Sequence, residues 1–298
     1  MSLAVIDIGG TTIKFGGYSA ETGLFQQTKV ATPKTLAAFY QCLQQQVAAL
    51  QQTSEVTGVA ISSPGVVDQA AGIIQGASAV PYIHHFPIVA ELTNRLKLPV
   101  TIENDANCAA LAEVQAGAAA DVRDAIFLVL GTGVGGAVIL NGQLHRGRHL
   151  MGGEFGYMWH GDDDTVSHLG TLVNTVARYN RRHGTHLDGK TLYEQARKGG
   201  QEAKKAVQRM FHVLATTIFN LQYSFDPDCF VIGGGISQNP HLLADLEAAL
   251  DTVMAQTELT PVRPVIRIAK FQADANLYGA AVHFQQQSQA GLSRLERK

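Results

Sequence analysis

Turns rich in glycine and threonine, each following an apolar strand, are the segments of this chain best suited to bind phosphate. The first lies within residues 5–17 (VIDIGGTTIKFGG) and the second within residues 126–140 (IFLVLGTGVGGAVIL). Glycine allows positive φ and close approach of the backbone, so consecutive N–H groups and threonine hydroxyls can converge on phosphate oxygens. The alternative is that both are ordinary hairpin turns, which glycine also favours. Because the pattern occurs twice, about 120 residues apart, we interpret the segments as phosphate turns of two related halves.

Asp7 stands just before the first turn. A carboxylate beside an anion-binding turn is unfavourable unless a cation lies between them, and Mg2+ commonly uses one or two carboxylates, or their bound waters, together with nucleotide phosphates. The sequence therefore predicts a nucleotide–Mg2+ complex, with Asp7 facing the metal directly or through water. Lys14, on the following strand, is a candidate for pairing with a phosphate or a carboxylate, the alternative being an outward-facing strand lysine.

Asn104 and Asp105 mark the point where an apolar strand is expected to give way to an alanine-rich helix. In α/β proteins, side chains at this position are presented to a ligand. If Asp105 accepts the proton of an alcohol while a γ-phosphoryl group is held in line, the reaction is phosphoryl transfer, in which the protein mainly supplies positioning and charge stabilisation. The simpler alternative is that one of the two residues caps the helix, and both roles can coexist.

The spacing of apolar residues predicts the strands and helices that would position these groups. In the first half we expect strands at residues 24–30, 56–61 and 100–102, and helices at residues 36–50, 88–96 and 106–116. In the second half we expect strands at residues 125–130, 136–140 and 229–232, and helices at residues 172–183, 203–225, 242–255 and 276–286. Strand hairpins followed by strand–helix alternation, twice over, predict two α/β domains with the ligand in the cleft between them. We place one domain at residues 1–118 plus 282–298 and the other at residues 119–281.

Composition favours a small-molecule partner. The formal net charge is -2 and the pI is about 6.6, so the chain has no electrostatic footprint for nucleic acid or an anionic membrane. Its three cysteines form no CxxC pair and no even disulfide framework, which fits a reducing compartment. We see no signal peptide and no apolar stretch long enough to span a bilayer, and we expect a cytoplasmic location.

Six short motifs together resemble the ROK family (repressor, open reading frame, kinase), whose kinases are bacterial sugar kinases. They occur in family order at residues 7–11 (DIGGT), 63–68 (SPGVVD), 103–107 (ENDAN), 131–136 (GTGVGG), 152–156 (GGEFG) and 232–236 (IGGGI). The resemblance runs along nearly the whole chain. It implies an α/β fold with two domains around a cleft, of the actin-like, hexokinase-like ATPase (ribonuclease H-like) type. It also implies ATP and Mg2+ as cofactors, and a homodimer.

The resemblance also implies roles for individual residues. Those implied to contact ATP are Asp7, Gly9, Gly10, Thr11, Gly131, Thr132, Gly133, Gly233, Gly234 and Gly235. Of these, Gly233, Gly234 and Gly235 would contact the adenosine, and Asp7 would hold Mg2+. Thr12 and Lys14, next to the first turn, are further candidate ATP contacts. Those implied to contact the sugar are Pro64, Gly65, Asn104, Asp105 and Glu154. Asp105 is implied to be the catalytic base that deprotonates the 6-hydroxyl of the sugar.

The chain departs from the family pattern at the zinc site and in the sugar pocket. Many members have a histidine and then a CxCGxxGCxE stretch after the GEFG segment, whereas this chain has Tyr157 at the histidine position and no cysteine in residues 166–173. Structural zinc needs four ligands, so we expect no zinc site. The histidines considered as substitutes do not match a zinc-site spacing: His145, His149, His160 and His168.

The same comparison puts Val173 in place of a sugar-contacting glutamate, and Ala79 and Ile83 in place of an asparagine and a tryptophan. Because of these losses, the sequence does not single out glucose among the candidate sugars. Tyr157 is retained as a candidate sugar contact. With Tyr82 and His84 it is a candidate to rebuild a pocket for another hexose, an acylated aminosugar such as N-acetylmannosamine, or a β-glucoside.

Two other function classes were considered. A sugar-responsive repressor is disfavoured, because the first phosphate motif begins at Asp7 and leaves no preceding helix-turn-helix in this sequence. A catalytically silent sugar-binding sensor of the same family is the remaining alternative to an ATP-dependent kinase.

Overall fold

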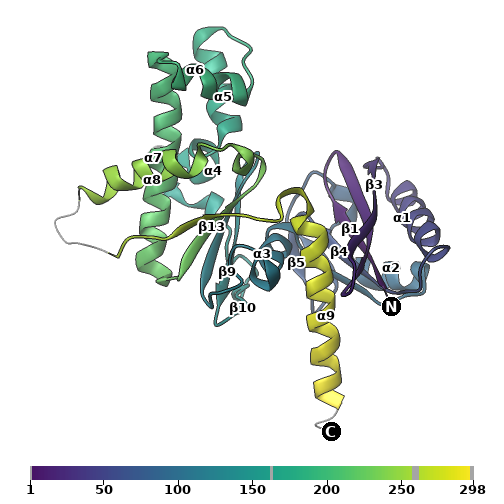
Figure 1. The fold of residues 1–298 in the computed structure, drawn as a ribbon. Coiled ribbons are helices and arrows are strands. Elements are labelled where there is room, and N and C mark those ends of the chain that lie inside the picture. Colours follow the sequence, from purple (N-terminus) through teal and green to yellow (C-terminus); the bar gives the residue numbers. More distant parts are fainter. Residues whose placement is uncertain (1, 162–163, 257–261, 296–298) are drawn as a thin grey trace. The chain divides into compact units, whose positions relative to one another are not determined.

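The protein is described by a computed structural model covering residues 2–161, 164–256 and 262–295 (Figure 1). The chain forms two compact units. Unit 1 comprises residues 1–116, 147–151 and 273–298, and unit 2 comprises residues 117–146 and 152–272. The chain thus returns to unit 1 at residue 273 rather than at the expected 282, because the N-terminal part of its last helix packs against strands of unit 1.

A five-stranded sheet in the order β3-β2-β1-β4-β7 forms the centre of unit 1. Its strands are β1 (Ser2–Ile8), β2 (Thr12–Ser19), β3 (Gly23–Ala31), β4 (Val56–Ser63) and β7 (Val100–Asn104). β1, β2 and β3 form antiparallel pairs, whereas β4 pairs in parallel with both β1 and β7. A small antiparallel hairpin, β5 (Val66–Asp68) and β6 (Ile73–Gln75), follows β4.

Helices cover both faces of this sheet, which explains why every residue of β1 is buried, including the polar Ser2 and Asp7. The helices are α1 (Leu36–Gln51), α2 (Ile88–Leu96), α3 (Asp105–Ala116) and α9 (Ala275–Leu295), with short 3-10 turns η1 (Pro81–Ile83) and η4 (Gln272–Asp274). Successive strand residues point to opposite faces. Ile6 and Ile8 pack in the cluster that contains residues of α1 and α2, whereas Leu3 and Val5 pack with residues of α3 and α9. Figure 1 shows α1 and α9 on opposite sides of the strands of unit 1.

The crossing of α3 and α9 depends on one glycine. A Cβ on Gly279 of α9 would lie 1.7 Å from the backbone oxygen of Cys108 in α3. No side chain fits at that distance, so glycine allows the two helix backbones to approach closely. The N-terminal part of α3, which begins at Asp105, is thereby tied to α9.

Unit 2 repeats the strand arrangement of unit 1, with a five-stranded sheet in the order β10-β9-β8-β13-β14. Its strands are β8 (Ala125–Leu130), β9 (Val134–Leu140), β10 (Gln143–Leu144), β13 (Cys229–Gly233) and β14 (Ile266–Ile268). Here too an antiparallel hairpin, β8 and β9, is followed by a strand, β13, that pairs in parallel with β8 and with β14. The two sheets therefore support the interpretation of two related halves.

The helices of unit 2 are α4 (Val166–Leu169), α5 (Leu172–His183), α6 (Gly189–Arg197), α7 (Gln201–Phe225) and α8 (Leu242–Met254). Short elements complete it: η2 (Phe155–Tyr157), η3 (Gly235–Gln238), and the two-stranded pair β11 (Trp159–His160) and β12 (Asp164–Thr165). One apolar cluster joins strands β8, β9 and β13 to residues of α4, α6, α7 and α8. Sequence patterning missed α6, whose buried residues are only Leu192, Tyr193 and Ala196.

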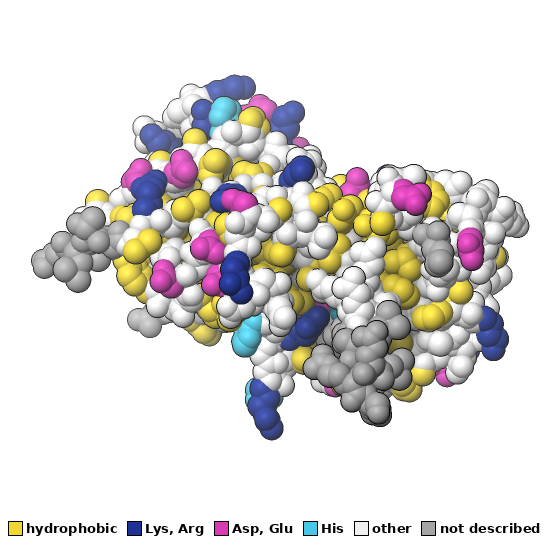
Figure 2. Space-filling model, turned by 60° about the horizontal axis from the view of Figure 1, so that its bottom comes forward, with side chains coloured by type: hydrophobic (Ala, Val, Ile, Leu, Met, Phe, Trp, Pro, Cys, Tyr) yellow, Lys and Arg dark blue, Asp and Glu magenta, His cyan; other side chains and the backbone are white. Residues whose placement is uncertain are grey.

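Two surface properties bear on function. None of the helices in the described part of the chain has both the length and the apolar character needed to cross a bilayer. On the face drawn in Figure 2, Lys and Arg side chains lie among Asp and Glu side chains and do not form a continuous stripe.

Candidate active site

The first glycine turn joins β1 to β2 in unit 1. It is closed by a hydrogen bond from Gly9 N to Thr12 O at 3.0 Å. Neither Gly9 nor Gly10 has positive φ. Glycine is required here by close approach instead, since a Cβ on Gly9 would lie 2.8 Å from Thr12 O. Gly10, Thr11 and Thr12 are exposed, so the threonine side chains remain accessible to a ligand.

Asp7 is held by three side chains at the end of β1, where it is 7% exposed. Ser62 Oγ and Asn276 Nδ2 each donate a hydrogen bond to Asp7 Oδ1 at 3.0 Å. Lys14 Nζ lies 3.2 Å from Asp7 Oδ2 and also donates to Ala273 O. Of the two interpretations of Lys14, the structure therefore favours pairing with a carboxylate over an outward-facing lysine.

Asn276, on the first turn of α9, was not recognised as a candidate from sequence. Its only sequence signal is a polar residue opening a run of small and apolar residues (ANLYGAA, residues 275–281). That pattern does not identify a partner 269 positions away.

The second glycine turn joins β8 to β9 in unit 2 and is closed by a hydrogen bond from Gly131 N to Gly133 O at 2.9 Å. Gly131 and Thr132 are exposed. Asn174 Nδ2 donates to Thr132 O at 3.1 Å and to Ser167 O at 3.0 Å. Val134 N donates to Ser167 Oγ at 2.9 Å. The turn is therefore held from outside by side chains of α4 and α5.

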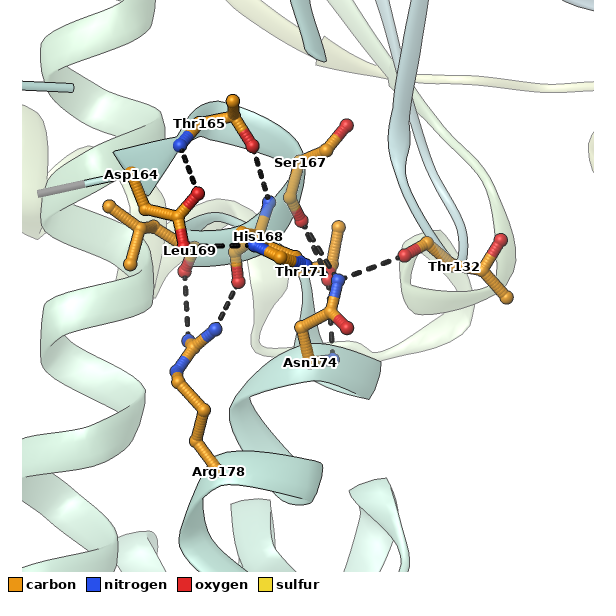
Figure 3. A network of polar contacts seen from close by, with 9 residues as sticks. All are labelled: Thr132, Asp164, Thr165, Ser167, His168, Leu169, Thr171, Asn174 and Arg178. Carbon is orange, nitrogen blue, oxygen red and sulfur yellow. Dashed lines mark hydrogen bonds and ion pairs between the residues drawn. The ribbon is translucent and has the colours of Figure 1, made fainter. Parts of the chain in front are cut away.

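These contacts belong to the polar network drawn in Figure 3, at the corner between α4 and α5. Thr171 caps α5 by accepting from Asn174 N, and Arg178 donates to the backbone oxygens of His168 and Leu169. His168 Nδ1 lies 2.8 Å from Asp164 Oδ2. Among the described residues, no group of three or more His, Cys, Asp or Glu side chains is placed to hold a metal ion. The absence of a zinc site nevertheless stays a prediction.

The third glycine segment follows β13. Gly234 has φ +89°, and a Cβ there would lie 2.2 Å from Leu130 O, so only glycine fits. Gly235 lines a cavity of about 1050 Å3 that lies within unit 2. The wall also contains Gly131 of the second turn, Val173 and Val176 of α5, and Tyr193 of α6. Val173, which the resemblance aligned with a sugar-contacting glutamate, thus lies at this cavity.

Three cationic side chains line the same cavity: Lys190, Arg197 and Lys198. Sequence analysis missed them together with α6. Tyr193 and Arg197 line both this cavity and a second one, and the Tyr193 hydroxyl donates to Asp245. Burial and that hydrogen bond raise the pKa of Tyr193 well above its ordinary value, so the hydroxyl stays protonated.

Asn104 and Asp105 lie where β7 ends and α3 begins, as the sequence predicts, and both are half-buried. Asn104 Oδ1 accepts from Asn107 N at 3.1 Å, which is the contact of an N-cap. Asn104 Nδ2 donates to Gly65 O at 3.0 Å, so the Pro64–Gly65 segment is joined to the same corner. Asp105 Oδ1 accepts from Ala106 N at 2.8 Å. Asn104 is therefore the capping residue, and capping does not account for Asp105.

Glu154 and Tyr157 belong to one 3-10 turn of unit 2. Glu154 is half-buried, and this burial raises the pKa of its carboxyl. Tyr157 is 72% exposed. By contrast, the hydroxyl of Tyr82 donates to Pro33 O, and buried His84 lies 2.7 Å from Ser78 Oγ through Nε2. These contacts hold both side chains within unit 1, and their part in a sugar pocket stays a prediction.

The predicted site residues thus fall into two groups. Unit 1 holds the first turn, Asp7 with Lys14, Pro64–Gly65, and Asn104 with Asp105. Unit 2 holds the second turn, the 233–235 segment, Glu154 and Tyr157.

A family model described as "ROK family" matches residues 3–287. A β-glucoside kinase of Listeria monocytogenes is 31% identical over 297 residues, which cover 96% of this chain and 98% of that protein. A solved ROK family protein from Streptococcus pneumoniae TIGR4, in complex with sucrose, has a TM-score of 0.89 and 39% identity over 97% of this chain and 100% of that one.

A ROK family glucokinase from Streptomyces griseus, in complex with glucose and AMPPNP, has a TM-score of 0.79 and 27% identity over 94% of this chain and 98% of that one. Together these similarities confirm the predicted family resemblance and the predicted two-domain α/β fold class.

Proposed function

The chain belongs to the ROK family, and we propose that it transfers the γ-phosphoryl group of ATP to the 6-hydroxyl of a hexose or hexose derivative. Its similarity to a β-glucoside kinase and to a glucokinase, each over nearly the whole chain, supports an ATP-dependent carbohydrate kinase. Asp105 is the proposed general base. The observation that carries this role is that Asp105 stands half-buried on the first turn of α3, while its neighbour Asn104 does the capping.

The proposed ATP site uses the glycine segments. We assign the adenosine to the 1050 Å3 cavity of unit 2, beside Gly233, Gly234 and Gly235, because that cavity also reaches Gly131 of the second turn. The phosphates are assigned to Gly131, Thr132 and Gly133, and to Gly9, Gly10, Thr11 and Thr12 of the first turn. Exposed backbone N–H groups and hydroxyls in such turns suit phosphate oxygens.

Asp7 is the proposed residue for Mg2+, directly or through water, with Lys14 beside it. The donor set fits a hard cation, because a carboxylate oxygen at the strand end next to a phosphate turn is the kind of ligand Mg2+ uses with nucleotides. When bound, Mg2+ supplies positive charge that offsets the charge of the phosphates. Ser62 and Asn276 keep the Asp7 carboxylate oriented. Lys14 is the nearest cation to Asp7 in the described structure and is assigned to the same phosphate end.

The proposed sugar contacts are Asn104, Asp105, Glu154, Tyr157, Pro64 and Gly65. Carboxylates and carboxamides can each hydrogen-bond adjacent sugar hydroxyls. A raised pKa leaves a larger fraction of Glu154 protonated near neutral pH than an exposed glutamate would have. Its carboxylate accepts hydrogen bonds from sugar hydroxyls, and only the protonated form also donates one. Asp105 takes the hydroxyl proton as the sugar oxygen attacks the γ-phosphorus, and the bond from the γ-phosphorus to the β,γ-bridging oxygen breaks to release ADP.

The decisive test is ADP release by the purified protein with ATP and Mg2+ across a sugar panel. The panel contains glucose, mannose, allose, fructose, N-acetylmannosamine, N-acetylglucosamine, cellobiose and methyl β-glucoside. One strong responder supports a sugar kinase and names its substrate, and mass analysis of the product locates the phosphate. No turnover with any sugar, together with measurable sugar binding by calorimetry, would favour the catalytically silent sensor.

The base assignment is tested with Asp105→Asn, which preserves size and removes the basic oxygen. We expect kcat to fall by about 10²- to 10⁴-fold while ATP binding stays close to wild type. Asp251→Asn is a matched control on an exposed part of α8, where Asp251 pairs only with Arg263 in the described structure, and its kcat should not change. Near-wild-type turnover by Asp105→Asn would refute the base role.

Three further expectations stay predictions: a homodimer, a cytoplasmic location, and the absence of nucleic-acid and membrane partners. The dimer is checked by sedimentation of the purified protein.

A further inference from the structure

One buried carboxylate has no role in the proposed mechanism although it is two residues before the candidate base Asp105 in the sequence. Glu103, the residue before Asn104, is 0% exposed. A carboxylate is costly to bury unless it is hydrogen-bonded or paired. The chain keeps one at the end of β7, where an apolar residue would suit a parallel strand covered on both faces. The hydrogen-bond partners of Glu103 indicate its role.

On one side, Glu103 holds the first turn of α3. Its Oε1 accepts from Asn104 N at 2.8 Å and from Asn107 Nδ2 at 3.0 Å. Asn107 N in turn donates to Asn104 Oδ1. A single carboxylate oxygen therefore fixes residues on both sides of Asp105, one at the end of the strand and one in the helix.

On the other side, Glu103 is held by elements distant in the sequence. Gln69, between β5 and β6, donates to Glu103 Oε2, and His283 Nδ1 of α9 lies 3.9 Å from the same oxygen. Gln69 Nε2 and His283 Nε2 lie 3.1 Å apart. Glu103 and His283 are 0% and 2% exposed, so the carboxylate and the imidazole are closed to solvent, whereas Gln69 is partly exposed.

Helix α9 links the side chains around Glu103 to Asp7, the candidate Mg2+ ligand. Asn276 and His283 are seven residues apart, which is close to two helical turns, and Gly279 lies between them on the same face. Asn276 contacts Asp7, Gly279 contacts the backbone of α3, and His283 contacts the Glu103 group. One face of α9 thus supports Asp7 and the start of α3 together.

We propose that Glu103, supported by Gln69 and His283, is a positioning residue for the phosphorylation reaction, which sets the orientation of Asp105 by clamping the first turn of α3. The proposal rests on the proposed function, since it gives Glu103 its role through the candidate base. Misplacing a catalytic group by about 1 Å can cost about 10²-fold in rate. Loss of the clamp should therefore lower kcat and leave the KM for ATP nearly unchanged, because the residues that contact Glu103 are not among those assigned to ATP: Gln69, Asn104, Asn107 and His283.

The test compares Glu103→Gln with Glu103→Leu in the sugar kinase assay. Gln keeps an acceptor for Asn104 N and Asn107 Nδ2, whereas Leu has a similar volume and no acceptor. We expect Glu103→Gln to retain kcat within about tenfold, and Glu103→Leu to lose about 10²-fold with KM for ATP within about twofold. Glu113→Leu is the matched control, since Glu113 is 1% exposed on the same helix and away from its first turn, and its kcat should stay near wild type.

Asn107→Ala is the milder variant if Glu103→Leu does not fold. It removes the helix side of the clamp and leaves Glu103 in place, and we expect kcat to fall about 3- to 10-fold at unchanged KM for ATP. Adding Asn107→Ala to Asp105→Asn should cause no further loss, because the two changes act through the same group.

The outcomes separate this proposal from the proposed function. If Asp105→Asn keeps its turnover, the base assignment fails and the role of Glu103 fails with it. If Asp105→Asn is inactive while Glu103→Leu or Asn107→Ala turns over as wild type, the clamp proposal alone is overturned. An equal loss in Glu113→Leu would also overturn it, since any buried glutamate of α3 would then have the same effect.

Discussion

The second phosphate turn is held by Asn174, and removing that side chain should weaken ATP binding. Asn174→Ala loses the hydrogen bonds to Thr132 O and Ser167 O, at 3.1 and 3.0 Å. A neutral hydrogen bond contributes about 1 kcal/mol net to the stability of the folded structure. The exposed bond to Thr132 O contributes less, because water can take the place of the Asn174 side chain. The loss is therefore about 1.5 kcal/mol, which corresponds to about tenfold weaker ATP binding if the turn must be held in place to bind phosphate.

The assay is calorimetric titration with a non-hydrolysable ATP analogue, together with thermal unfolding. Asn180→Ala is the matched control on the same helix. Its side chain donates to Leu187 O and accepts from Leu187 N and Thr185 Oγ1, so it has at least as many contacts, and none is with the turn. We expect Asn180→Ala to lower the melting temperature without changing the affinity for the analogue. Wild-type affinity in Asn174→Ala, or an equal loss in both variants, would refute the reasoning.

Three other predictions concern stability. Gly279→Ala should abolish or severely reduce folding of unit 1, because its Cβ would lie 1.7 Å from Cys108 O, and soluble yield with circular dichroism checks this. Thr35→Ala removes the side-chain cap that accepts from Ala38 N on α1 and should lower the free energy of unfolding by about 1 kcal/mol in urea titration. Burial raises the pKa of Glu154 in the folded state, so the folded protein binds this proton more tightly than the unfolded chain does, and stability falls as pH rises through and above the ordinary glutamate range. Glu154→Gln should reduce that fall, because the amide does not ionise. The melting temperature of the variant relative to that of the wild type should therefore rise from about pH 4 to about pH 7. A difference that does not change with pH would show that burial of the Glu154 carboxyl is not the cause.

Regular elements with a clear apolar period were predicted well from sequence. The helix expected at residues 36–50 is α1 (Leu36–Gln51), and the one expected at residues 172–183 is α5 (Leu172–His183). Helix α6 was missed because its sequence is mostly polar and it buries few side chains. Helix α9 extends past the expected residue 286, along a polar stretch rich in Gln and Ser whose composition gives no apolar period.

Local motifs placed candidate residues on the correct elements but did not reveal their partners. Asn104 and Asp105 were expected at a strand-to-helix junction, and they lie there. Which of the two caps the helix depends on side-chain direction, and the structure shows that it is Asn104. The contact of Asn276 with Asp7 joins residues near opposite ends of the chain, and neither motif nor periodicity reports such a pairing.

The route of the chain has a consequence for the order of folding during synthesis. Apart from residues 147–151, unit 2 is one continuous stretch, whereas unit 1 needs α9, the last described helix, to cover Leu3, Val5 and Cys108. We infer that residues 2–116 leave the ribosome with one apolar face uncovered, and that about 160 further residues (117–274) are made before α9 begins to bury that face. A chain ending at residue 272 should therefore keep unit 2 resistant to limited proteolysis and leave residues 2–116 readily cut; equal resistance of the two parts would contradict this order. Ribosome-associated chaperones, which bind exposed apolar segments, are thus expected to act on the first third of this protein rather than on its middle.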